Sequence, residues 1–316
     1  MLNKSSKIEN VIIIGSGPAG LAVAVYTSRA NLSPLMFAGS PYGGQLMLTS
    51  EVENYPGFAS ILGPELIEKM RQHVTKFGTR VLDQNVTKVD FSKRPFAINS
   101  LQQQYLAQAV IIATGAQALW LGLKNEQRLR GKGVSACATC DGFFFKEKVV
   151  AVVGGGDTAM EEALTLTKFA SKVHIIHRRD SFRASKIMQD RVLANKKIEV
   201  SWNSVVEDVL GQDKVGGIKI KDLLRQETRE LKVDGFFLAI GHKPDTQLFQ
   251  GQIELDPKGY ITTYKKDHFT SLTSVPGVFA AGDCVDYIYR QAGTAVGMGI
   301  AAALDTERWL EISSQL

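Results

Sequence analysis

The sequence contains one strand–turn–helix plan twice, and this duplication limits the possible folds more than any other feature. NVIIIGSGPAG at residues 10–20 places a β-branched run before three glycines, and a helical stretch follows. KVVAVVGGGDTAMEEAL at residues 148–164 repeats that order. Each copy later ends on an apolar strand with a glycine, VIIATGA at 110–116 and FFLAIGHKP at 236–244. The duplication predicts an α/β chain with two Rossmann-like dinucleotide-binding domains.

The second copy is predicted to be inserted into the first. No third glycine-rich unit begins after residue 244, and small and apolar residues recur at helical spacing from about residue 290. A helix of this kind needs a partner surface, so we assign it to the first domain. We therefore expect one domain from residues 1–117 and 245–316, and an inserted domain from residues 118–244.

Composition excludes several classes of protein. With 316 residues, 44% hydrophobic and 22% charged, the chain is long enough for two cores and has the balance of a soluble globular protein. No apolar run approaches the ~18 residues that cross a bilayer, and no secretory signal begins the chain, so we expect no membrane contact and a cytoplasmic location. A net charge of +5 without basic runs interleaved with aromatics argues against nucleic-acid binding. Three cysteines argue against a disulfide scaffold, and Cys284 is expected to be a buried small residue.

The first glycine motif is Gly15-x-Gly17-x-x-Gly20. Between a strand and a helix, its glycines permit a tight turn, the close approach of a pyrophosphate and helix–strand packing, and Pro18 suits the first helical turn. An acid that binds a ribose hydroxyl usually ends the following strand, but PLMFAGS at residues 34–40 has none. The pattern alone therefore leaves the ligand of this site open.

The second glycine motif is Gly154-x-Gly156-x-x-Ala159. The strand after it ends in a basic cluster where an acid is usual. Guanidinium groups there suit a dianionic 2′-phosphate, which favours NADPH over NADH; a solvated basic strand end is the alternative. The cluster consists of His177, Arg178, Arg179 and Arg183.

A third feature is FAAGDCVD, a strand that ends in Gly282 and Asp283 before a helix near Arg290. A carboxylate at a strand's carboxyl end can accept a hydrogen bond from a ribityl hydroxyl, and a helix N-terminus can stabilise negative charge on a reduced flavin. Taken alone, Gly-Asp is also a common turn.

Cys137 and Cys140 allow three interpretations. Zinc needs about four donors, but the sequence has no second CxxC, and His174 and His177 would face opposite sides of a strand, so we expect no metal site. A staple across so short a loop would contribute only about 2 kcal/mol. A redox pair remains, in which one thiol is readily ionised and Asp141 exchanges protons with the sulfurs.

Seven motifs occur in a single order along the chain: GSGPAG, GGQL, EVENYPGF, CATCDG, GGGDTAMEEA, HRRDSFRAS and AAGD…YRQA. Together they give the chain a resemblance to the low-molecular-weight thioredoxin reductases over nearly its whole length. The resemblance implies that the first ligand is FAD, that the second is NADPH, that thioredoxin is the protein substrate and that the chain forms a homodimer.

The resemblance also implies the residues of both cofactor sites. Residues 16–19 would line the flavin pyrophosphate, Val86 would contact the adenine side and Asp283 the ribityl chain. The residues implied for FAD are Gly15, Ser16, Gly17, Pro18, Ala19, Gly20, Gly43, Gly44, Gln45, Asn54, Val86, Gly115, Asp283, Arg290, Gln291 and Ala292. Those implied for NADPH are Gly154, Gly156, Asp157, Thr158, His177, Arg178, Arg179, Arg183 and Ile240.

The implied activity is that of a thioredoxin-disulfide reductase, with Cys137, Cys140 and Asp141 as catalytic residues. Cys140 would lie nearer the flavin and Cys137 would attack the protein substrate. Because the cysteines and the nicotinamide must both approach the flavin, we expect the inserted domain to rotate about its two linkers. Three alternatives are distinguishable: a ferredoxin reductase would lack the CxxC, a dithiol oxidase would lack the arginines, and an NADPH-binding sensor would contain no flavin.

Overall fold

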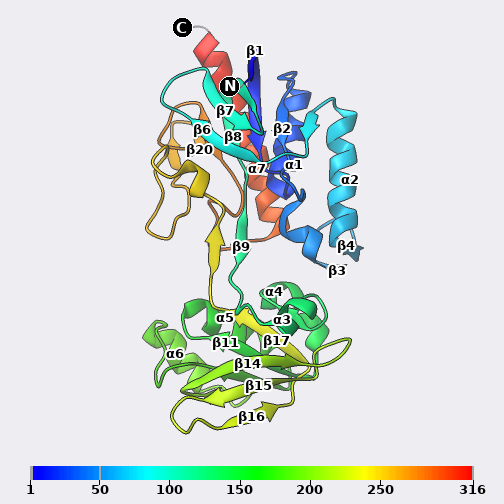
Figure 1. Cartoon of the computed structure of the whole chain (residues 1–316), viewed down its shortest axis with the longest axis vertical. Helices are drawn as coiled ribbons and strands as arrows, with labels where there is room; N and C mark the ends of the chain where they lie inside the picture. The colour runs from blue at the N-terminus through cyan, green and yellow to red at the C-terminus, as the bar shows by residue number, and fades with distance from the viewer. Residues whose placement is uncertain (1–2, 50, 315–316) are drawn as a thin grey trace. The chain divides into compact units, whose positions relative to one another are not determined.

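The computed structural model describes residues 3–49 and 51–314, and the chain divides into two compact units. Unit 1 comprises Met1–Gln117 and Lys243–Leu316, and unit 2 comprises Ala118–His242. The chain crosses between the units at β9 (Ala116–Ala118) and β18 (His242–Pro244), which pair in a two-stranded sheet (Figure 1). One Rossmann-like unit inserted into another confirms the predicted fold class.

The main sheet of unit 1 has a parallel centre in the order β21–β8–β1–β2–β5. The antiparallel strands β19 and β20 extend it beyond β21, and the hairpin β6–β7 pairs with the first half of β8. The strands are β1 (Asn3–Ile14), β2 (Leu35–Phe37), β5 (Arg80–Leu82), β6 (Val86–Asp90), β7 (Phe96–Ser100), β8 (Gln103–Ile112), β19 (Tyr264–Lys266), β20 (Phe269–Leu272) and β21 (Val278–Ala280).

Both faces of this sheet are buried, which explains why its central strands are continuous apolar runs rather than alternating ones. On one face, Val11 and Ile13 join a core cluster with residues of α1 (Pro18–Arg29) and α7 (Ala292–Ser314), helices that contact each other (Figure 1). On the other face, Ile12 packs in a cluster that includes Phe96 and Phe249. A third helix, α2 (Gly63–Lys76), packs against α1.

Unit 2 repeats the plan with a smaller parallel sheet, β10–β17–β11–β12–β13. One face packs on α5, and the other packs on the antiparallel sheet β14–β15–β16 (Figure 1). The strands are β10 (Val134–Ser135), β11 (Val149–Gly154), β12 (Lys172–Ile176), β13 (Ile198–Ser201), β14 (Ser204–Leu210), β15 (Gly217–Asp222), β16 (Thr228–Leu231) and β17 (Gly235–Ala239). The helices are α3 (Lys124–Arg128), α4 (Ala138–Asp141), α5 (Asp157–Leu166) and α6 (Lys186–Leu193).

The strand before each glycine-rich turn occupies an equivalent position in its own sheet. In unit 1, β1 lies between β8 and β2; in unit 2, β11 lies between β17 and β12. Short elements complete the chain: β3 (Glu51–Val52), β4 (Ile61–Leu62) and the 3₁₀ turns η1 (Gly44–Leu48), η2 (Gly142–Phe145) and η3 (Gln247–Phe249). Within the described ranges, no helix has both the length and the apolar character that a bilayer span requires.

Candidate active site and cofactor sites

Cys137 and Cys140 form a disulfide in unit 2, with their Cα atoms 5.3 Å apart. Cys137 is the N-cap of α4, and its Sγ accepts a hydrogen bond from the backbone N–H of Cys140 at 3.1 Å. Upstream, the N–H of Cys137 donates to the Oγ of Ser135 at 3.0 Å. The pair therefore spans a short helix in which one amide, that of Cys140, donates to the sulfur of Cys137.

A carboxylate from α5 accepts a hydrogen bond from the first residue of α4. The side chain of Glu162 accepts a hydrogen bond from the N–H of Ala138, the residue directly after Cys137. Ala138 is only 1% exposed, so its N–H could not be satisfied by bulk water. Glu162 thus supplies the partner that the helix itself cannot provide.

Asp141 ends α4 and is partly buried. Burial raises the pKa of this carboxyl above its ordinary value, and a hydrogen bond from the Ser135 side chain opposes the shift. A raised pKa keeps the proton on the carboxyl to a higher pH, which suits a group that delivers a proton to a departing thiolate.

The third cysteine, Cys284, is buried and does not belong to the redox pair. Cys284 in unit 1 is fully buried and unpaired, and its Sγ lies 3.3 Å from the carbonyl oxygen of Ala281. Burial raises the pKa of this thiol to about 11. A protonated, inaccessible thiol is unreactive, which agrees with its expected role as a small core residue.

The glycine-rich turn of unit 1 brings two backbones into close contact and leaves one position open. Gly15 has φ +114°, and a Cβ there would lie 2.2 Å from the carbonyl oxygen of Ala113; at Gly20 it would lie 2.1 Å from that of Gly15. A Cβ at Gly17, by contrast, would meet nothing within 4 Å. Gly17 is the N-cap of α1, and no side chain caps that helix. The open space and the uncapped amides fit a pyrophosphate.

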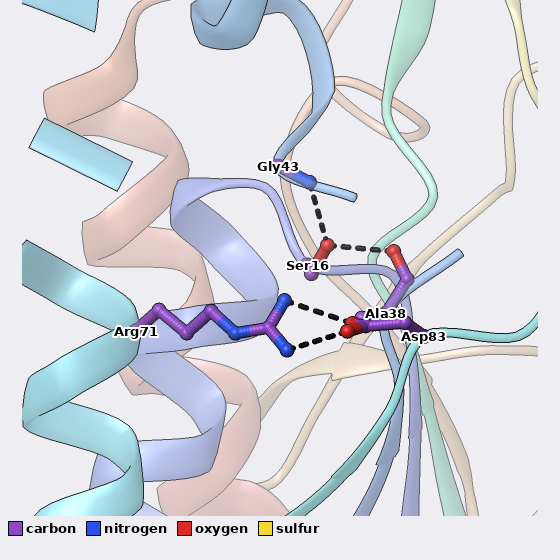
Figure 2. A network of polar contacts seen from close by, with 5 residues as sticks. All are labelled: Ser16, Ala38, Gly43, Arg71 and Asp83. Carbon is purple, nitrogen blue, oxygen red and sulfur yellow. Dashed lines mark hydrogen bonds and ion pairs between the residues drawn. The ribbon is translucent and has the colours of Figure 1, made fainter. Parts of the chain in front are cut away.

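The middle of this turn is tied to the strand beside it. The Oγ of Ser16, which is 5% exposed, donates to the carbonyl oxygen of Ala38 at 2.6 Å and accepts from the N–H of Gly43 at 2.8 Å (Figure 2). Nearby, Arg71 and Asp83 form a two-pronged ion pair at 2.8 and 2.7 Å (Figure 2). The first contact fixes the turn against the end of β2, and the second joins α2 to the segment after β5.

Two residues assigned to the flavin from distant parts of the sequence come together. Asn54 donates from Nδ2 to Oε1 of Gln291 at 3.2 Å, across 237 positions. Just before Gln291, the carboxylate of Asp286 accepts from the N–H of Arg290 at 2.9 Å and so shapes the turn into α7. Burial, and secondarily the nearby Asp286, raise the pKa of Asp283 to about 6.

The remaining residues assigned to FAD lie on several elements of unit 1. Gly44 and the exposed Gln45 lie on η1, and Val86 is the first residue of β6. Gly115 follows β8 and has φ +75°. The carboxyl ends of β1 and β8 meet at one edge of the sheet, which places Gly115 on the same side as the glycine-rich turn.

The turn of unit 2 resembles that of unit 1 in the space around its first and third glycines. A Cβ at Gly154 would lie 2.4 Å from the carbonyl oxygen of Ala239, whereas one at Gly156 would meet nothing within 4 Å. Gly156 is the N-cap of α5, again without a side-chain cap. The middle position differs, because a Cβ at Gly155 would lie 2.1 Å from the imidazole of His177.

His177 joins this turn to the arginine-rich segment. Its Nδ1 lies 2.8 Å from the carbonyl oxygen of Gly154, and its Nε2 lies 3.0 Å from that of Ser181. The ring is 6% exposed and contacts Phe182 and Trp202. Burial lowers the pKa of this histidine, and the two carbonyl contacts oppose the shift. Both ring nitrogens therefore face carbonyl oxygens of the protein, and the neutral imidazole can donate a hydrogen bond to only one of them.

The three arginines are presented to solvent by this arrangement. Arg178, Arg179 and Arg183 are exposed, and the N–H of Arg183 donates to the carbonyl oxygen of Gly155 at 2.7 Å. Asp157, the first residue of α5, accepts from the N–H and Oγ of Ser185, both at 2.8 Å, and these bonds lower its pKa. The backbone of Arg183 is thus held against the glycine-rich turn, next to its open position at Gly156.

Two other residues of unit 2, Thr158 and Ile240, were assigned to NADPH from the resemblance. Thr158 is the second residue of α5, and Ile240 directly follows β17. In the part of the chain that the structure describes, no group of three or more His, Cys, Asp or Glu side chains is placed to hold a metal ion.

Ser135 and Glu162 were not among the residues that we predicted from the sequence. A signal for Glu162 exists in hindsight: it lies three residues after Ala159 and four before Leu166, both fully buried on α5. An acid at that spacing lies at the edge of a buried helix face. Which backbone amide it meets depends on tertiary packing.

Comparisons with known proteins find similar proteins that match nearly the whole chain. A family model for "Pyridine nucleotide-disulphide oxidoreductase" matches residues 9–299. A thioredoxin reductase of Rickettsia conorii is 53% identical over 305 residues, covering 95% of this chain and 97% of the relative. One of Streptomyces clavuligerus is 52% identical over 308 residues, covering 96% and 95%. Among solved structures, a thioredoxin reductase from Giardia duodenalis superposes with a TM-score of 0.91 at 46% identity, covering 96% of this chain and 98% of the other.

Proposed function

The chain belongs to the pyridine nucleotide-disulphide oxidoreductase family and, within it, to the thioredoxin reductases, and on this premise we propose its reaction. Two electrons from NADPH pass by way of FAD and the Cys137–Cys140 pair to the disulfide of thioredoxin. The products are NADP⁺ and the dithiol form of thioredoxin, with one further proton consumed. The observation that supports this most directly is the Cys137–Cys140 disulfide at the start of α4.

The two cofactors have separate sites in this proposal. FAD would bind unit 1, with its pyrophosphate at the open position of Gly17 and its ring near Asn54 and Gln291. NADPH would bind unit 2, with its pyrophosphate at Gly156 and its 2′-phosphate at the exposed arginines. When bound, the flavin supplies a carrier that accepts two electrons from a nicotinamide and passes them to a disulfide.

The cysteines then act by thiol–disulfide exchange. The Cys137 thiolate attacks one sulfur of the thioredoxin disulfide, forming a mixed disulfide and releasing the other sulfur as a thiolate, which Asp141 protonates. Cys140 next attacks the sulfur of Cys137, which releases the second thiol of thioredoxin and closes the Cys137–Cys140 disulfide. The N–H of Cys140, which contacts Cys137 Sγ at 3.1 Å, stabilises negative charge on that sulfur.

Alternate access to the flavin is part of the proposal. The cysteines and the proposed nicotinamide site belong to the same unit, so unit 2 must present each of them in turn. We expect rotation about the crossings β9 and β18. A crosslink that locks the two units together should stop turnover, and full activity in the locked protein would refute the rotation.

Anaerobic addition of NADPH tests the reaction. The purified protein should be yellow, its flavin absorbance should bleach, and about two thiols should appear. A Cys137→Ser, Cys140→Ser protein should bleach but release no new thiols and should not reduce thioredoxin. A colourless protein that binds no FAD on reconstitution would instead favour a sensor that binds NADPH.

We also propose that the chain works as a homodimer in the cytoplasm, as the resemblance to this family implies. Light scattering of the purified protein should give twice the mass of the chain. A monomer at micromolar concentration would contradict the first part of this proposal, and export of the full-length chain in a cell fractionation would contradict the second.

A further inference from the structure

The short helix that contains the redox cysteines is held at its start by a different helix. Glu162 of α5 accepts the N–H of Ala138, and α4 and α5 lie side by side (Figure 1). Ala138 directly follows Cys137 and is almost fully buried. The acceptor of this N–H is therefore a charged group placed next to the first residue of the redox pair.

A second group beside Cys137, the backbone N–H of Cys140, favours negative charge on its sulfur. The N–H of Cys140 donates to Cys137 Sγ at 3.1 Å, and amides at a helix start lower the pKa of a cysteine. The N–H of Ala138 is the first amide of the same helix. Its bond to the Glu162 carboxylate uses that donor and places a negative charge at the residue that directly follows Cys137, which opposes formation of a thiolate there.

We propose that Glu162 is a positioning residue that makes the Cys137–Cys140 dithiol a stronger reductant, by holding a negative charge against the first turn of α4. Disulfide sulfurs are uncharged, whereas the reduced pair forms a thiolate. A nearby carboxylate therefore destabilises the reduced form relative to the disulfide and favours the release of electrons to the protein substrate. This inference rests on the proposed role of the pair as the electron carrier.

The test is the equilibrium between the pair and dithiothreitol. The Cys137–Cys140 disulfide accepts two electrons and two protons from dithiothreitol and becomes two thiols, while dithiothreitol closes to its own disulfide. Purified flavoprotein is equilibrated without oxygen, quenched with acid, and alkylated after unfolding. Mass spectrometry then finds one label on the oxidised chain, from Cys284, and three on the reduced chain.

Glu162→Gln removes the charge while retaining an oxygen that can accept the Ala138 N–H. We expect its equilibrium constant for reduction to be about three- to tenfold larger than that of the unchanged protein. Because a tenfold change for a two-electron couple is about 30 mV, the midpoint should become about 15–30 mV more positive. The pKa of the more acidic thiol in the reduced protein, from the pH dependence of its alkylation rate, should fall by about 0.5–1 unit.

Two further variants keep the test falsifiable. Glu230→Gln removes an exposed carboxylate from β16 of the same unit and should stay within twofold of the unchanged protein. Glu162→Asp retains the charge and should also stay within about twofold. A Glu162→Gln protein within twofold of the unchanged one, or shifted to a more negative midpoint, overturns the inference. So does a Glu162→Asp protein that shifts as far as Glu162→Gln.

This measurement uses neither NADPH nor thioredoxin. If turnover with thioredoxin fails but Glu162→Gln shifts the dithiothreitol equilibrium as expected, the proposed function is wrong and the role of Glu162 stands. If turnover succeeds and the equilibrium does not shift, the reverse holds.

Discussion

The two glycine-rich turns have the same backbone plan but are tied to the neighbouring strand in opposite directions. In unit 1 the side chain belongs to the turn: Ser16 donates to the carbonyl oxygen of Ala38, directly after β2. In unit 2 the side chain belongs to the strand end: His177, directly after β12, contacts the carbonyl oxygen of Gly154. A glycine occupies the middle of the second turn because the imidazole fills the space of a side chain.

This difference separates what the fold requires from what the ligand requires. The first glycine of each turn is forced by a neighbouring carbonyl oxygen, and Gly17 and Gly156 leave equivalent open positions. Both units can therefore receive a pyrophosphate in the same way. The units differ in the residues after the connected strand: unit 1 has no charge there, whereas unit 2 extends into exposed arginines that His177 holds near the turn.

The largest expected effect comes from removing the charge that only unit 2 has at this place. Arg179→Gln with Arg183→Gln should raise the KM for NADPH about 100-fold and leave the KM for NADH nearly unchanged, because each charged hydrogen bond contributes about 1.5–3 kcal/mol. Steady-state kinetics with both nucleotides measure this. Lys186→Gln removes an exposed cation that pairs with Asp190 and should change neither KM by more than about twofold. Equal losses for both nucleotides would mean that the arginines do not bind a 2′-phosphate.

The next prediction compares equivalent glycines of the two turns. Gly155→Ala should destabilise unit 2 by about 2 kcal/mol, because the new methyl group would overlap the buried ring of His177. Adding His177→Ala should recover part of this loss. In the flavin-free protein, Gly17→Ala points into open space and should change stability by less than about 0.5 kcal/mol. With flavin present, the same variant should bind it more weakly. Urea unfolding measures the stabilities, and equal values for Gly155→Ala and Gly17→Ala would contradict the comparison.

Removing the hydrogen bonds of Ser16 in unit 1 should lower the free energy of unfolding by a smaller amount. Ser16→Ala removes the acceptor of the buried Gly43 N–H and the donor to Ala38, at a cost of about 1–2 kcal/mol in the free energy of unfolding. Thr87→Ala removes an exposed 3.3 Å hydrogen bond to Asn99 in the same unit and serves as the control, with less than about 0.5 kcal/mol expected. Hydrogen exchange at Gly43 should also accelerate in the Ser16 variant alone.

The smallest effect concerns an acid of unit 1. The pKa of Asp283 is about 6 in the folded protein against an ordinary 3.8, so the folded state binds the proton more tightly than the unfolded state. Stability from this group is therefore present below about pH 4 and lost as pH rises through about 6. In the flavin-free protein, Asp283→Asn should add about 1 kcal/mol at pH 7.5 and nothing at pH 4. Urea unfolding at both pH values measures this, and a gain that does not depend on pH would contradict it.

The sequence was sufficient to predict the features that depend on local backbone rules. Gly15 and Gly154 could be recognised because a strand, a turn and a helix leave no space for a side chain there. The repetition of that plan also predicted the inserted unit. The identity of the flavin could not be worked out in this way, since the strand that ends at Ala38 lacks the usual acid, and it came only from the resemblance to a family.

Contacts between residues far apart in the chain could not be predicted from the sequence. We grouped His177 with three arginines as one basic cluster, and only packing shows that its ring lies between two carbonyl oxygens. Likewise, the pairing of Asn54 with Gln291 and of Glu162 with Ala138 depends on how helices and loops meet in three dimensions. Side-chain direction at a strand end and the partner of a helix-edge carboxylate are tertiary properties.

The pairing of β9 with β18 has a practical consequence for protein engineering. Since the chain leaves unit 1 and returns to it on adjacent strands, the two ends of the excised segment are already neighbours. A tight turn could join Gln117 to Lys243 and yield unit 1 as an uninterrupted chain, and Ala118 and His242 could likewise become the termini of an isolated unit 2. Each half could then be tested for binding of the dinucleotide proposed for it, and the inserted unit could be exchanged between relatives without redesigning unit 1.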